Sequence, residues 1–600
     1  MLSARIQSRL AAAAAAVLPG VPAAGLQLRP SEPRFGDFQC TSLVALAKRR
    51  GMNPRELAAD VAARLDVADL CAGVEVSGPG FLNFRLRDDV LAAAVDAALR
   101  DEHPCFAPAA APRTYVVDFS APNVAKPMHV GHIRSTGIGD ALVRLLRLLG
   151  HRVITDNHIG DWGTQFGILL LGWKTRLNRA ALAADPLAEL ERLYKELNEV
   201  CDPDKSAFDP AQREAAKAEL VKLQAGDAEN LAIWREMQRL SQAQFDALYA
   251  RLGIRFDHAL GESFYNPWLS GIVEELLAAG IARRSEDAVA VFSADVFPDP
   301  ATRPPPKDDP FLVKNREGAW ADFPALIQKS DGGFNYMTTD LATLRHRLRE
   351  WRPDEIVYVV DDRQAPHFRQ LFAIAARWLP EVAAGRVRLT HVGFGKICGP
   401  DGKPLKTRAG GTVKLADLLD EAEERALAIV TAKNPDLPAA ERREIARVVG
   451  LGAVRYADLL PHRTSDYVFD WDKMLALQGN TAPYLQYAYA RTRSVLRRAA
   501  EAGAAPGGPV TLAEPAERAL ARHLLNFGFA LEAAAAEYRP NLLCNHLYDL
   551  AGLLAQFWEQ CPVLKAGDDV RASRLTLCDL TGRVLKTGLN TLGIEVLDRM

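Results

Sequence analysis

The middle of the chain alternates short hydrophobic runs with amphipathic stretches. Runs of β-branched and aromatic residues occur at 115–119 (YVVDF) and 356–360 (IVYVV), and each precedes a polar loop and then a helical pattern. Such runs are typical of strands buried on both faces of a parallel sheet. The alternation predicts a multidomain α/β protein with a doubly wound parallel sheet. Ligands bind such sheets at the carboxyl ends of the strands, where three polar loops fall: 120–132, 156–163 and 361–367.

The remaining pattern predicts further domains. Near the N-terminus, helical stretches and two strand-like segments around Gly-Pro-Gly predict a small α+β domain, in which Asn53 caps a helix that has Pro54 at its first position. From about Val413 the pattern is almost wholly helical. The predicted domains are 1–112 (α+β), 113–398 (the sheet, with a helical and β insertion at about 175–325 lying outside it), 399–470 (a mobile basic loop and a helical region) and 471–600 (all-α).

Composition and charge narrow the class of protein. The 600 residues are 48% hydrophobic and 25% charged, as in a globular protein of several domains. No apolar run approaches the roughly 20 residues that span a bilayer, so no membrane segment is expected. The net charge of −2 excludes a uniformly basic coat for nucleic acid but allows local basic patches. The eight cysteines form no CxxC pair, which favours reduced thiols in a cytoplasmic protein over disulfides or structural zinc.

The first 31 residues contain arginines but no acidic residue, and they include the run AAAAAAVL at 11–18. This composition is compatible with a transit peptide. It also fits an alanine-rich amphipathic helix that ends at Pro19-Gly20. The position of a later motif, which begins at Phe35, favours the helix.

Residues 120–132 (SAPNVAKPMHVGH) are the first candidate for a phosphate site. A strand, a polar loop and a helix start place backbone N–H groups and the positive end of the helix dipole against an anion. The spacing of His129 and His132 puts both imidazoles on one side of the first helical turn, and Gly131 lets a ligand approach the backbone. The segment matches neither the Walker loop nor GxGxxG. An isolated HxGH could equally be two surface histidines.

A second candidate is GPDGKPLKTRAGGT at 399–412. It contains Lys403, Lys406 and Arg408 among glycines just after a predicted strand. Backbone bends and compact cations suit a mobile clamp on a triphosphate. Alone, such a loop is more often a solvated turn.

Together, HVGH and the KTR loop resemble the two signature elements of class I aminoacyl-tRNA synthetases. Neighbouring motifs narrow the resemblance to the arginyl-tRNA synthetases and extend it over essentially the whole chain. In that family the FGDFQ-like motif lies near the start of the polypeptide, so its position at Phe35 leaves little room for a cleaved presequence. The motifs are FGDFQ…ALAK, VEVSGPGFLNFRL, SAPNVAKPMHVGHIRST, DNHIGDWGTQFG, KSDGGFNYMTTDLA, VVDDRQAPHF, KTRAGGTVKLADLLDEA, GNTAPYLQYAYAR and GRVLKTGLNTLGIEVLDRM.

The resemblance implies a Rossmann-like catalytic domain that forms arginyl-adenylate from ATP and L-arginine and transfers arginine to tRNA(Arg). Activation is expected to require the tRNA. Mg²⁺ would be held mainly by ATP phosphates and water, since no dedicated carboxylate cage is visible and no metal ligands are assigned. Residues 1–112 would contact the outer corner of the tRNA, and residues 471–600 would bind the anticodon. No coiled coil or long apolar face is evident, so a monomer is expected.

The resemblance also assigns site residues. The class loop ends in Lys-Met-Ser-Lys, whereas this chain has Lys403-Pro-Leu-Lys406-Thr-Arg408 and no final lysine, so which cation acts is open. Family members with such a loop carry a lysine at the position of Lys126, which would supply the missing charge; alone, Lys126 would be a solvated loop residue. The catalytic residues are Lys126, His129, His132, Lys406 and Arg408, and the ATP-binding residues are Lys126, His129, Gly131, His132 and Lys406.

The arginine-binding residues implied by the resemblance are Asn123, Glu262, Tyr336, Asp340 and Gln364. Carboxylates are the best partners for a planar guanidinium, which suits Glu262 and Asp340. Tyr336 and Asp340 match the family pattern Y-x-x-x-D-L-A, with Asp340 expected to start a helix. Without the resemblance, Asp340 would be a helix-start acid, and Glu262 and Gln364 would be solvent-facing.

One helix face in the C-terminal region is a candidate for RNA contact. Aromatic side chains beside cations suit stacking on unpaired bases and contact with phosphates. More often such a stripe belongs to a core, with arginines at its edge. The residues, at helical spacing, are Tyr484, Tyr487, Arg491 and Arg498.

Two other functions are less consistent with the sequence. A different class I synthetase, such as a cysteine-specific one, would need a zinc site that the scattered cysteines do not offer. An RNA-binding paralogue without catalysis would be expected to have lost His129, His132 or Asp340, and all three are present.

Overall fold

The computed structural model describes residues 2–20, 25–406 and 413–600. By its contacts the chain forms two compact units. The sheet unit comprises residues 110–425 and 461–471, and the terminal unit comprises residues 1–109, 426–460 and 472–600. No helix in the described part of the chain is long and apolar enough to cross a membrane.

Four parallel strands form the centre of the sheet unit, in the order β13-β12-β5-β6. The central strands are almost wholly buried, as expected of a sheet covered on both faces. This arrangement confirms the predicted doubly wound fold. The chain runs outward from β5 to β6 and outward from β12 to β13, so the strand order reverses between β5 and β12. Folds of this kind bind ligands at the carboxyl ends of the strands at that point. The strands are β5 (Thr114–Asp118), β6 (Arg152–Asp156), β12 (Glu355–Tyr358) and β13 (Arg388–His391).

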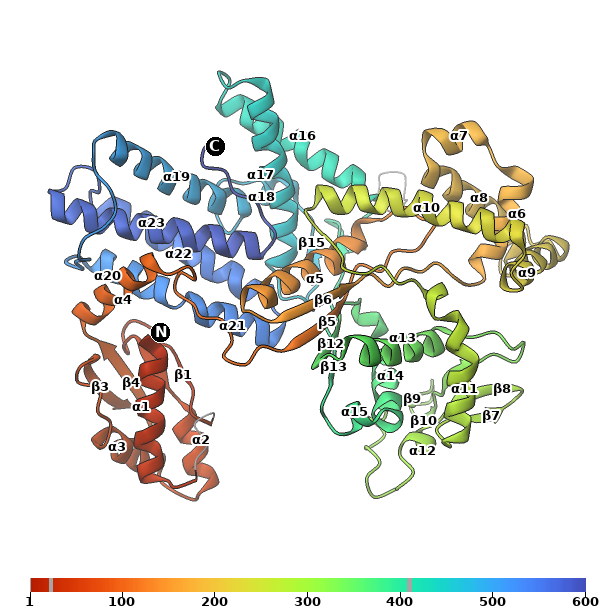
Figure 1. Ribbon diagram of the computed structural model, residues 1–600, viewed down its shortest axis with the longest axis horizontal. Helices are drawn as coiled ribbons and strands as arrows, with labels where there is room; N and C mark the ends of the chain where they lie inside the picture. Colours follow the sequence, from red (N-terminus) through yellow and green to blue (C-terminus); the bar gives the residue numbers. More distant parts are fainter. Residues whose placement is uncertain (1, 21–24, 407–412) are drawn as a thin grey trace. The chain divides into compact units, whose positions relative to one another are not determined.

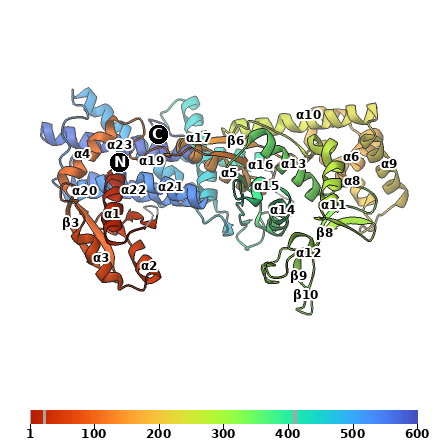
Figure 2. The same ribbon diagram turned by 60° about the horizontal axis from the view of Figure 1, so that its bottom comes forward.

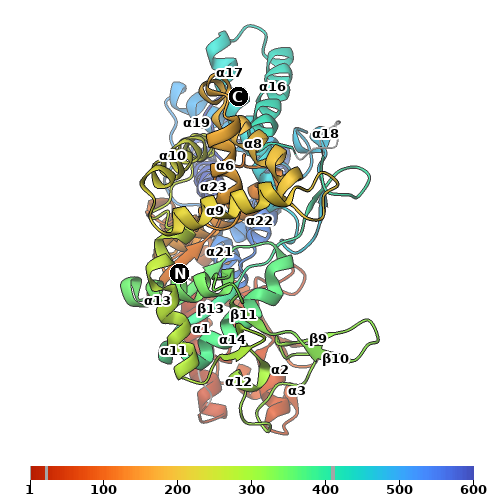
Figure 3. The same ribbon diagram turned by 90° about the vertical axis from the view of Figure 1, so that its right-hand side faces the viewer.

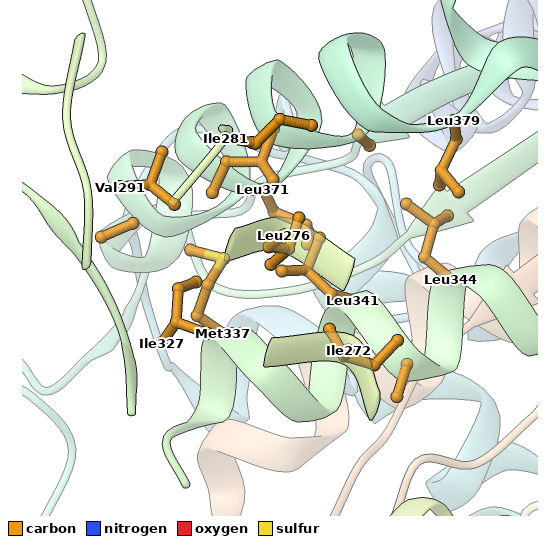
Figure 4. Close-up of a cluster of buried hydrophobic side chains, with 14 of the residues drawn as sticks. Ile272, Leu276, Ile281, Val291, Ile327, Met337, Leu341, Leu344, Leu371 and Leu379 are labelled. Carbon is orange, nitrogen blue, oxygen red and sulfur yellow. The ribbon is translucent and has the colours of Figure 1, made fainter. Parts of the chain in front are cut away.

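Helices cover both faces of this sheet. Figure 1 shows α5 (Val130–Leu148) on one side of the strands and α13 (Tyr336–Trp351) and α14 (Ala365–Trp378) on the other. Buried side chains from α11 (Leu269–Ala278), α13 and α14 converge in one cluster, in which Leu276, Leu341 and Leu371 are fully buried (Figure 4). Burial of each such side chain contributes about 1.5–3 kcal/mol, so this cluster fixes α13 and α14 on the sheet.

The insertion begins with five helices and ends with short strands. Its longest helix, α10, runs beside α6, α8 and α9 (Figure 2). The strands form an antiparallel sheet, β11-β8-β7, and a separate hairpin, β9-β10, which projects from the rest of the insertion (Figure 3). The elements are α6 (Gln165–Arg176), α7 (Arg179–Ala184), α8 (Pro186–Cys201), α9 (Pro210–Gln224), α10 (Ala228–Arg251), η2 (Glu262–Trp268), β7 (Arg283–Ser285), β8 (Ala288–Val291), α12 (Ser293–Val296), β9 (Leu312–Lys314), β10 (Trp320–Asp322) and β11 (Ala325–Gln328).

One local prediction in the sheet unit was wrong. The helix expected to start at Asp340 begins four residues earlier, because Asn335 accepts a hydrogen bond from the Tyr336 N–H and ends the preceding loop there. The region from Val413 onward is almost wholly helical, as expected, but it also contains the two-residue strand β15 (Tyr467–Val468), which pairs with β14 (Ile397–Cys398). The remaining elements are η3 (Asp362–Gln364), α15 (Pro380–Ala383) and α16 (Leu415–Lys433), whose last turns belong to the terminal unit.

The N-terminal part of the terminal unit is α+β, as its pattern predicts. Asn53 accepts a hydrogen bond from the Arg55 N–H at 3.0 Å with Pro54 at the first helical position, which confirms the predicted cap. The alanine-rich segment is helical, and it buries Ile6 and Leu10. The elements are α1 (Leu2–Val17), β1 (Leu28–Pro30), β2 (Phe38–Cys40), α2 (Ser42–Arg49), α3 (Pro54–Ala63), β3 (Cys71–Ser77), β4 (Phe81–Leu86) and α4 (Asp88–Arg100), with sheet order β1-β2-β4-β3.

The C-terminal part is a bundle of helices, as predicted. α19 packs against α23, and α20 and α21 pack against α22. The elements are α17 (Ala439–Leu459), α18 (Trp471–Met474), α19 (Ala482–Glu501), α20 (Pro515–Leu525), α21 (Phe527–Glu537), α22 (Pro540–Gln560) and α23 (Asp568–Thr591).

Candidate active site

The loops after β5, β6 and β12 meet at the carboxyl edge of the sheet. The Ser135 hydroxyl donates to the Val359 carbonyl at 2.6 Å, which joins the start of α5 to the end of β12. Asn123 and Gly160 form a parallel bridge between the loops after β5 and β6. A Cβ at Gly160 would collide with the Asn123 side chain, so this close approach requires glycine. The three polar loops therefore lie together, as the doubly wound fold predicts.

The loop after β5 holds an unusual backbone conformation. Ser120, Ala121 and Ala125 have φ angles of 76°, 46° and 64°, in the left-handed region that non-glycine residues rarely adopt. Each such residue costs about 1–3 kcal/mol and persists only where its surroundings impose it. Here side chains accept hydrogen bonds from all three backbone N–H groups: Ser135 from Ser120, Asn157 from Ala121 and Ser241 from Ala125.

Helix α10 of the insertion is one of the elements that impose this conformation. The buried Tyr249 hydroxyl lies 2.8 Å from the Ser120 Oγ and accepts from the Asn157 amide at 3.0 Å. Ser241, two helical turns earlier, accepts from the Ala125 N–H at 3.0 Å. Sequence reasoning placed the insertion outside the sheet and missed this role. The available signal was Ser241, Phe245 and Tyr249 at i, i+4 and i+8, which share one helix face and are all buried.

The two histidines close the first turn of α5. The His129 ring accepts at Nδ1 from the Gly131 N–H, and the His132 ring accepts at Nδ1 from the His129 N–H, both at 3.0 Å. The ring centroids are 4.0 Å apart. A neutral imidazole that accepts at Nδ1 carries its proton on Nε2. Both rings therefore present an Nε2–H donor away from the backbone, beside the positive end of the helix dipole.

Both imidazoles are held neutral. Burial, and then the neighbouring His129, lower the pKa of His132 to about 3. Burial, and then the Arg363 guanidinium, lower the pKa of His129 below its usual value. At neutral pH the pair therefore donates hydrogen bonds without adding charge.

The segment that follows the basic loop pairs with the histidine segment. The Val130 N–H donates to the Val413 carbonyl at 2.9 Å, and the Leu415 N–H donates to the Met128 carbonyl at 2.9 Å. Lys414 is thereby bridged to His129 and adds a cation that sequence reasoning did not select. Lys403 and Lys406, which lie earlier in the chain, are exposed. Arg408 lies outside the described residues.

Lys126 is not a freely solvated loop residue. Its ammonium nitrogen lies 4.6 Å from the centroid of the Tyr194 ring, which belongs to α8. The side chain is half-buried, and this burial lowers the pKa of Lys126, although Glu191 opposes the shift. A cation over an aromatic face is stabilised by about 0.5–2 kcal/mol. Tyr194 therefore helps to hold the Lys126 side chain in position, three residues before His129.

Glu262 and Asp340, two of the predicted arginine-binding residues, lie near each other and near Asp161, and this group of carboxyls is termed the acidic pocket. Burial, and then the carboxylates of Asp340 and Asp161, raise the pKa of Glu262 to about 8. Tyr336 is 70% exposed, and partial burial together with the charge of Glu262 raises its pKa. Tyr336 and Asp340 are one turn apart on α13, so both face Glu262 from the same helix.

Helix α13, which carries Tyr336 and Asp340, is anchored to the sheet by a buried arginine. Arg347, fully buried on α13, donates to Asp118 and Asp156 at 2.7 and 2.8 Å. These two carboxylates end β5 and β6. Of the other predicted arginine-binding residues, Asn123 is exposed and its side chain lies against Gly160, while Gln364 is exposed directly before α14.

A histidine that sequence reasoning did not select contacts the pocket. His367 Nε2 lies 2.6 Å from Asp340 Oδ2, and about three quarters of each side chain is buried. Burial opposes the charged imidazolium, but the hydrogen bond and charge of Asp340 outweigh it and raise the pKa of His367. The available signal was the motif DDRQAPHF, in which His367 follows Gln364 by three positions.

The predicted RNA-contacting face of α19 lies at the surface of the terminal unit. Tyr487 is 49% exposed, and Arg491 and Arg498 are also exposed. Tyr484 is half-buried with its ring centroid 5.8 Å from that of Tyr548, and the Arg491 guanidinium lies 4.4 Å over the Trp558 ring. The stripe is therefore an aromatic and basic surface rather than part of the core.

In the described residues, no three His, Cys, Asp or Glu side chains are grouped as metal ligands. The side chains described above are neutral donors, cations and an acidic pair. Such a site can bind phosphates on one side and a cationic substrate group on the other.

Family models cover most of the chain. Residues 94–471 match the catalytic domain of class I tRNA synthetases (R), residues 485–600 match a DALR anticodon binding domain, and residues 2–86 match the arginyl tRNA synthetase N terminal domain.

Individual proteins match over nearly their full length. The arginine–tRNA ligase of Laribacter hongkongensis is 44% identical over 593 residues, with 98% of each chain covered. That of Escherichia fergusonii is 47% identical over 582 residues, with 96% of each chain covered. The Thermus thermophilus arginyl-tRNA synthetase structure is 27% identical, with a TM-score of 0.80 and full coverage of both chains. The Plasmodium falciparum arginyl-tRNA synthetase structure is 26% identical, with a TM-score of 0.79 and coverage of 100% and 99%.

Proposed function

The chain belongs to the class I arginyl-tRNA synthetases, and we propose how its residues perform the reaction of that family. It ligates L-arginine to tRNA with ATP. The observation that carries this function is the match of catalytic, N-terminal and anticodon-binding models in order along one chain, together with identity of 44–47% to arginine–tRNA ligases over almost the full length. These arginine-specific matches leave no support for a cysteine-specific synthetase.

The proposed reaction begins with attack of the arginine carboxylate on the α-phosphate of ATP, which forms arginyl-adenylate and pyrophosphate. This displacement needs positioning and charge stabilisation rather than a covalent nucleophile. His129 and His132 would donate from Nε2 to the phosphates, and Gly131 would allow them to approach the first turn of α5. Both rings are already fixed by their Nδ1 hydrogen bonds, so no reorientation accompanies the reaction.

Cations would balance the charge that develops on the phosphates. We assign this role to Lys126, Lys406 and Arg408, with Lys126 taking the place of the lysine that the basic loop lacks. The half-buried position of Lys126 on Tyr194 supports this assignment, because a held cation loses less entropy on binding than a solvated one. Mg²⁺ would enter as part of the MgATP substrate, held by phosphates and water.

The arginine substrate would lie with its guanidinium between Glu262 and Asp340. Two carboxylates can pair with two edges of the planar guanidinium fork, which a lysine ammonium does not present. Tyr336 would cover the side chain, Gln364 would contact the substrate, and Asn123 would contact its α-amino group. The mutual charge effects of Glu262, Asp340 and Tyr336 support this pocket.

The tRNA would contact both parts of the terminal unit. We assign residues 1–112 to its outer corner and residues 471–600 to the anticodon, with Tyr484, Tyr487, Arg491 and Arg498 on the contacting face. Residues 113–398 would hold the catalytic site, with the insertion at 175–325, and residues 399–470 would carry the basic loop and contact the tRNA stem. We further propose a cytoplasmic monomer; all eight cysteines are free and buried, which suits a reducing compartment.

Pyrophosphate exchange tests the proposal. Arginine-dependent exchange of labelled pyrophosphate into ATP is measured with and without tRNA(Arg). We expect exchange only when arginine and tRNA are both present. Exchange driven by another amino acid would contradict the arginine pocket, and exchange without tRNA would contradict the tRNA requirement alone. Binding of tRNA without exchange or aminoacylation would instead indicate an RNA-binding paralogue.

A further inference from the structure

The acidic pocket contains more titratable groups than a guanidinium needs. Glu262 and Asp340 would suffice to pair with it, yet His367 also contacts Asp340 at 2.6 Å, and Asp161 lies near Glu262. In the described part of the chain, no lysine or arginine forms an ion pair with Glu262 or Asp340. The negative charge of the empty pocket is therefore balanced from within the pocket itself.

We propose that arginine enters this pocket in exchange for a proton, which the cluster of Glu262, Asp340 and His367 releases to solvent when the guanidinium binds. His367 is then a positioning residue, which holds Asp340 and shares its charge while the pocket is empty. The inference rests on the assignment of this pocket to the arginine side chain.

The geometry holds the cluster members in place from separate elements. Glu262 begins η2, and its neighbour Ser263 donates to the Asp161 carboxylate through its backbone N–H at 2.8 Å and its hydroxyl at 2.6 Å. Asp340 is fixed on α13 and His367 on α14, and these helices pack against each other. The charged side chains of the cluster are therefore held close to one another.

One position in the cluster carries a proton when the pocket is empty. Burial and two neighbouring carboxylates raise the pKa of Glu262 to about 8, so its carboxyl is mostly neutral at pH 7. Burial opposes the imidazolium of His367, but the hydrogen bond and charge of Asp340 outweigh it and raise the pKa of His367. The groups that face the cluster are Asp161 from the loop after β6, Tyr336 from α13 and Tyr358 from β12, which lies near Asp340.

Binding of a guanidinium reverses these preferences. A permanent cation beside Glu262 favours its ionised form, and a cation on Asp340 competes with the imidazolium of His367 for the same carboxylate. Both effects release protons, so the arginine dissociation constant should fall as pH rises from 6 to 8.5. Each proton released contributes a slope of up to roughly tenfold per pH unit.

Citrulline provides a matched neutral ligand. Its urea group has nearly the shape of the guanidinium but no charge, and its carbonyl can accept a hydrogen bond from a protonated Glu262 carboxyl. Citrulline should therefore bind without proton release, and the preference for arginine over citrulline should increase with pH. A preference that stays constant from pH 6 to 8.5 would contradict the exchange.

Calorimetry tests the exchange directly. L-Arginine is titrated at pH 7 into the full chain saturated with tRNA(Arg), without ATP, in phosphate and in Tris, which differ widely in ionisation enthalpy. We expect the observed enthalpies to differ by the release of about one proton. Glu262→Gln and His367→Gln should each reduce the release, because glutamine keeps a hydrogen-bonding group but does not titrate. His151→Gln, at the opposite end of β6 from the pocket, should leave the release unchanged.

The outcomes separate the inference from the pocket assignment. Equal enthalpies in both buffers, with normal arginine binding, would overturn the proton exchange and leave the pocket assignment intact. An Asp340→Asn variant that binds arginine as tightly as the parent would overturn the pocket assignment. Because the unsubstituted protein gives the first result, the test does not depend on any variant folding.

Discussion

At the scale of single residues, His129 and His132 serve the fold and the site with different atoms. Each Nδ1 satisfies a backbone N–H that the first turn of α5 would otherwise leave unpaired, and each Nε2 is left to donate outward. The spacing of the histidines was visible in the sequence. Their protonation was not, because it depends on burial in the folded protein, on Arg363 near His129 and on the His129 ring beside His132.

The two functions of His132 can be separated by substitution. In His132→Asn the side-chain oxygen can still accept from the His129 N–H, but the Nε2 donor is lost. We expect the first turn of α5 to remain formed while turnover falls by roughly 10²–10³-fold. His132→Ala should lose the cap as well, at about 1 kcal/mol. Hydrogen exchange of the His129 amide and pyrophosphate exchange measure the two effects, and equal turnover of His132→Asn and the parent would contradict the donor role.

The proposed role of Lys126 in stabilising the phosphates can be tested by substitution. Lys126→Ala should lower turnover by roughly 10²-fold or more, because a cation that stabilises the phosphates is removed, while tRNA binding stays near normal. Lys195→Ala is the control, since Lys195 is an exposed lysine of α8 paired with Glu191. Aminoacylation kinetics and tRNA filter binding give the readouts. Unchanged turnover in Lys126→Ala would return this residue to the role of an ordinary loop lysine.

At the scale of elements, α10 shows how an insertion becomes part of the site. The sequence pattern predicted a helix in this region. The contacts of α10 with Ser120 and Ala125, however, join residues more than 100 positions apart. No local pattern specifies such a pairing. The strained loop after β5 depends on it, because non-glycine residues do not keep positive φ angles without external support.

Tyr249→Phe tests this dependence. The substitution removes one hydroxyl, so the Asn157 amide loses an acceptor and the Ser120 hydroxyl loses one partner but keeps Thr136. Such a loss costs about 1–3 kcal/mol for buried polar groups. We expect faster hydrogen exchange in residues 119–126 and kcat/KM for exchange lower by roughly tenfold or more. Tyr115→Phe, which removes a hydroxyl at the other end of β5, should change neither measurement. An unaltered loop in Tyr249→Phe would mean that the remaining hydrogen bonds suffice.

At the scale of the whole molecule, the ends of the chain fold into one unit. Arg518 of α20 contacts Asp37 at 3.0 Å and Asp88 at 2.7 Å, so the C-terminal helices are joined to the N-terminal α+β region. The Asp37 side chain is only 2% exposed. The two regions matched by separate family models are therefore linked by a buried ion pair within the terminal unit.

Arg518→Met should loosen this link. Removing one partner of a buried pair leaves an uncompensated charge and costs about 3–5 kcal/mol. We expect faster hydrogen exchange in β2 and β4 and weaker tRNA binding, with arginine binding unchanged. Adding Asp37→Asn should restore part of the protection, because the buried charge is then removed as well. The exposed pair of Arg5 and Asp69 is the comparison, and Arg5→Met should cost at most about 1 kcal/mol. A similar effect of both arginine substitutions would contradict the importance of burial.

The sequence by itself determined the features that depend on near neighbours and on burial. The runs at 115–119 and 356–360 predicted β5 and β12 because a strand covered on both faces is mainly apolar. Asn53 and Pro54 predicted the start of α3, since a helix cap uses residues within one turn. The motifs also identified the family, because each short segment retains its residues in order along the chain.

Only the tertiary structure decided the features that depend on distant partners. The start of α13 was misplaced because Asn335, rather than Asp340, caps it. The bridge from Lys414 to His129, the ring of Tyr194 over Lys126 and the contact of His367 with Asp340 join separate elements, so no spacing in the sequence reports them. The raised pKa of Glu262 follows from the same cause, since it depends on burial in the folded protein and on the charges of Asp340 and Asp161 on other elements.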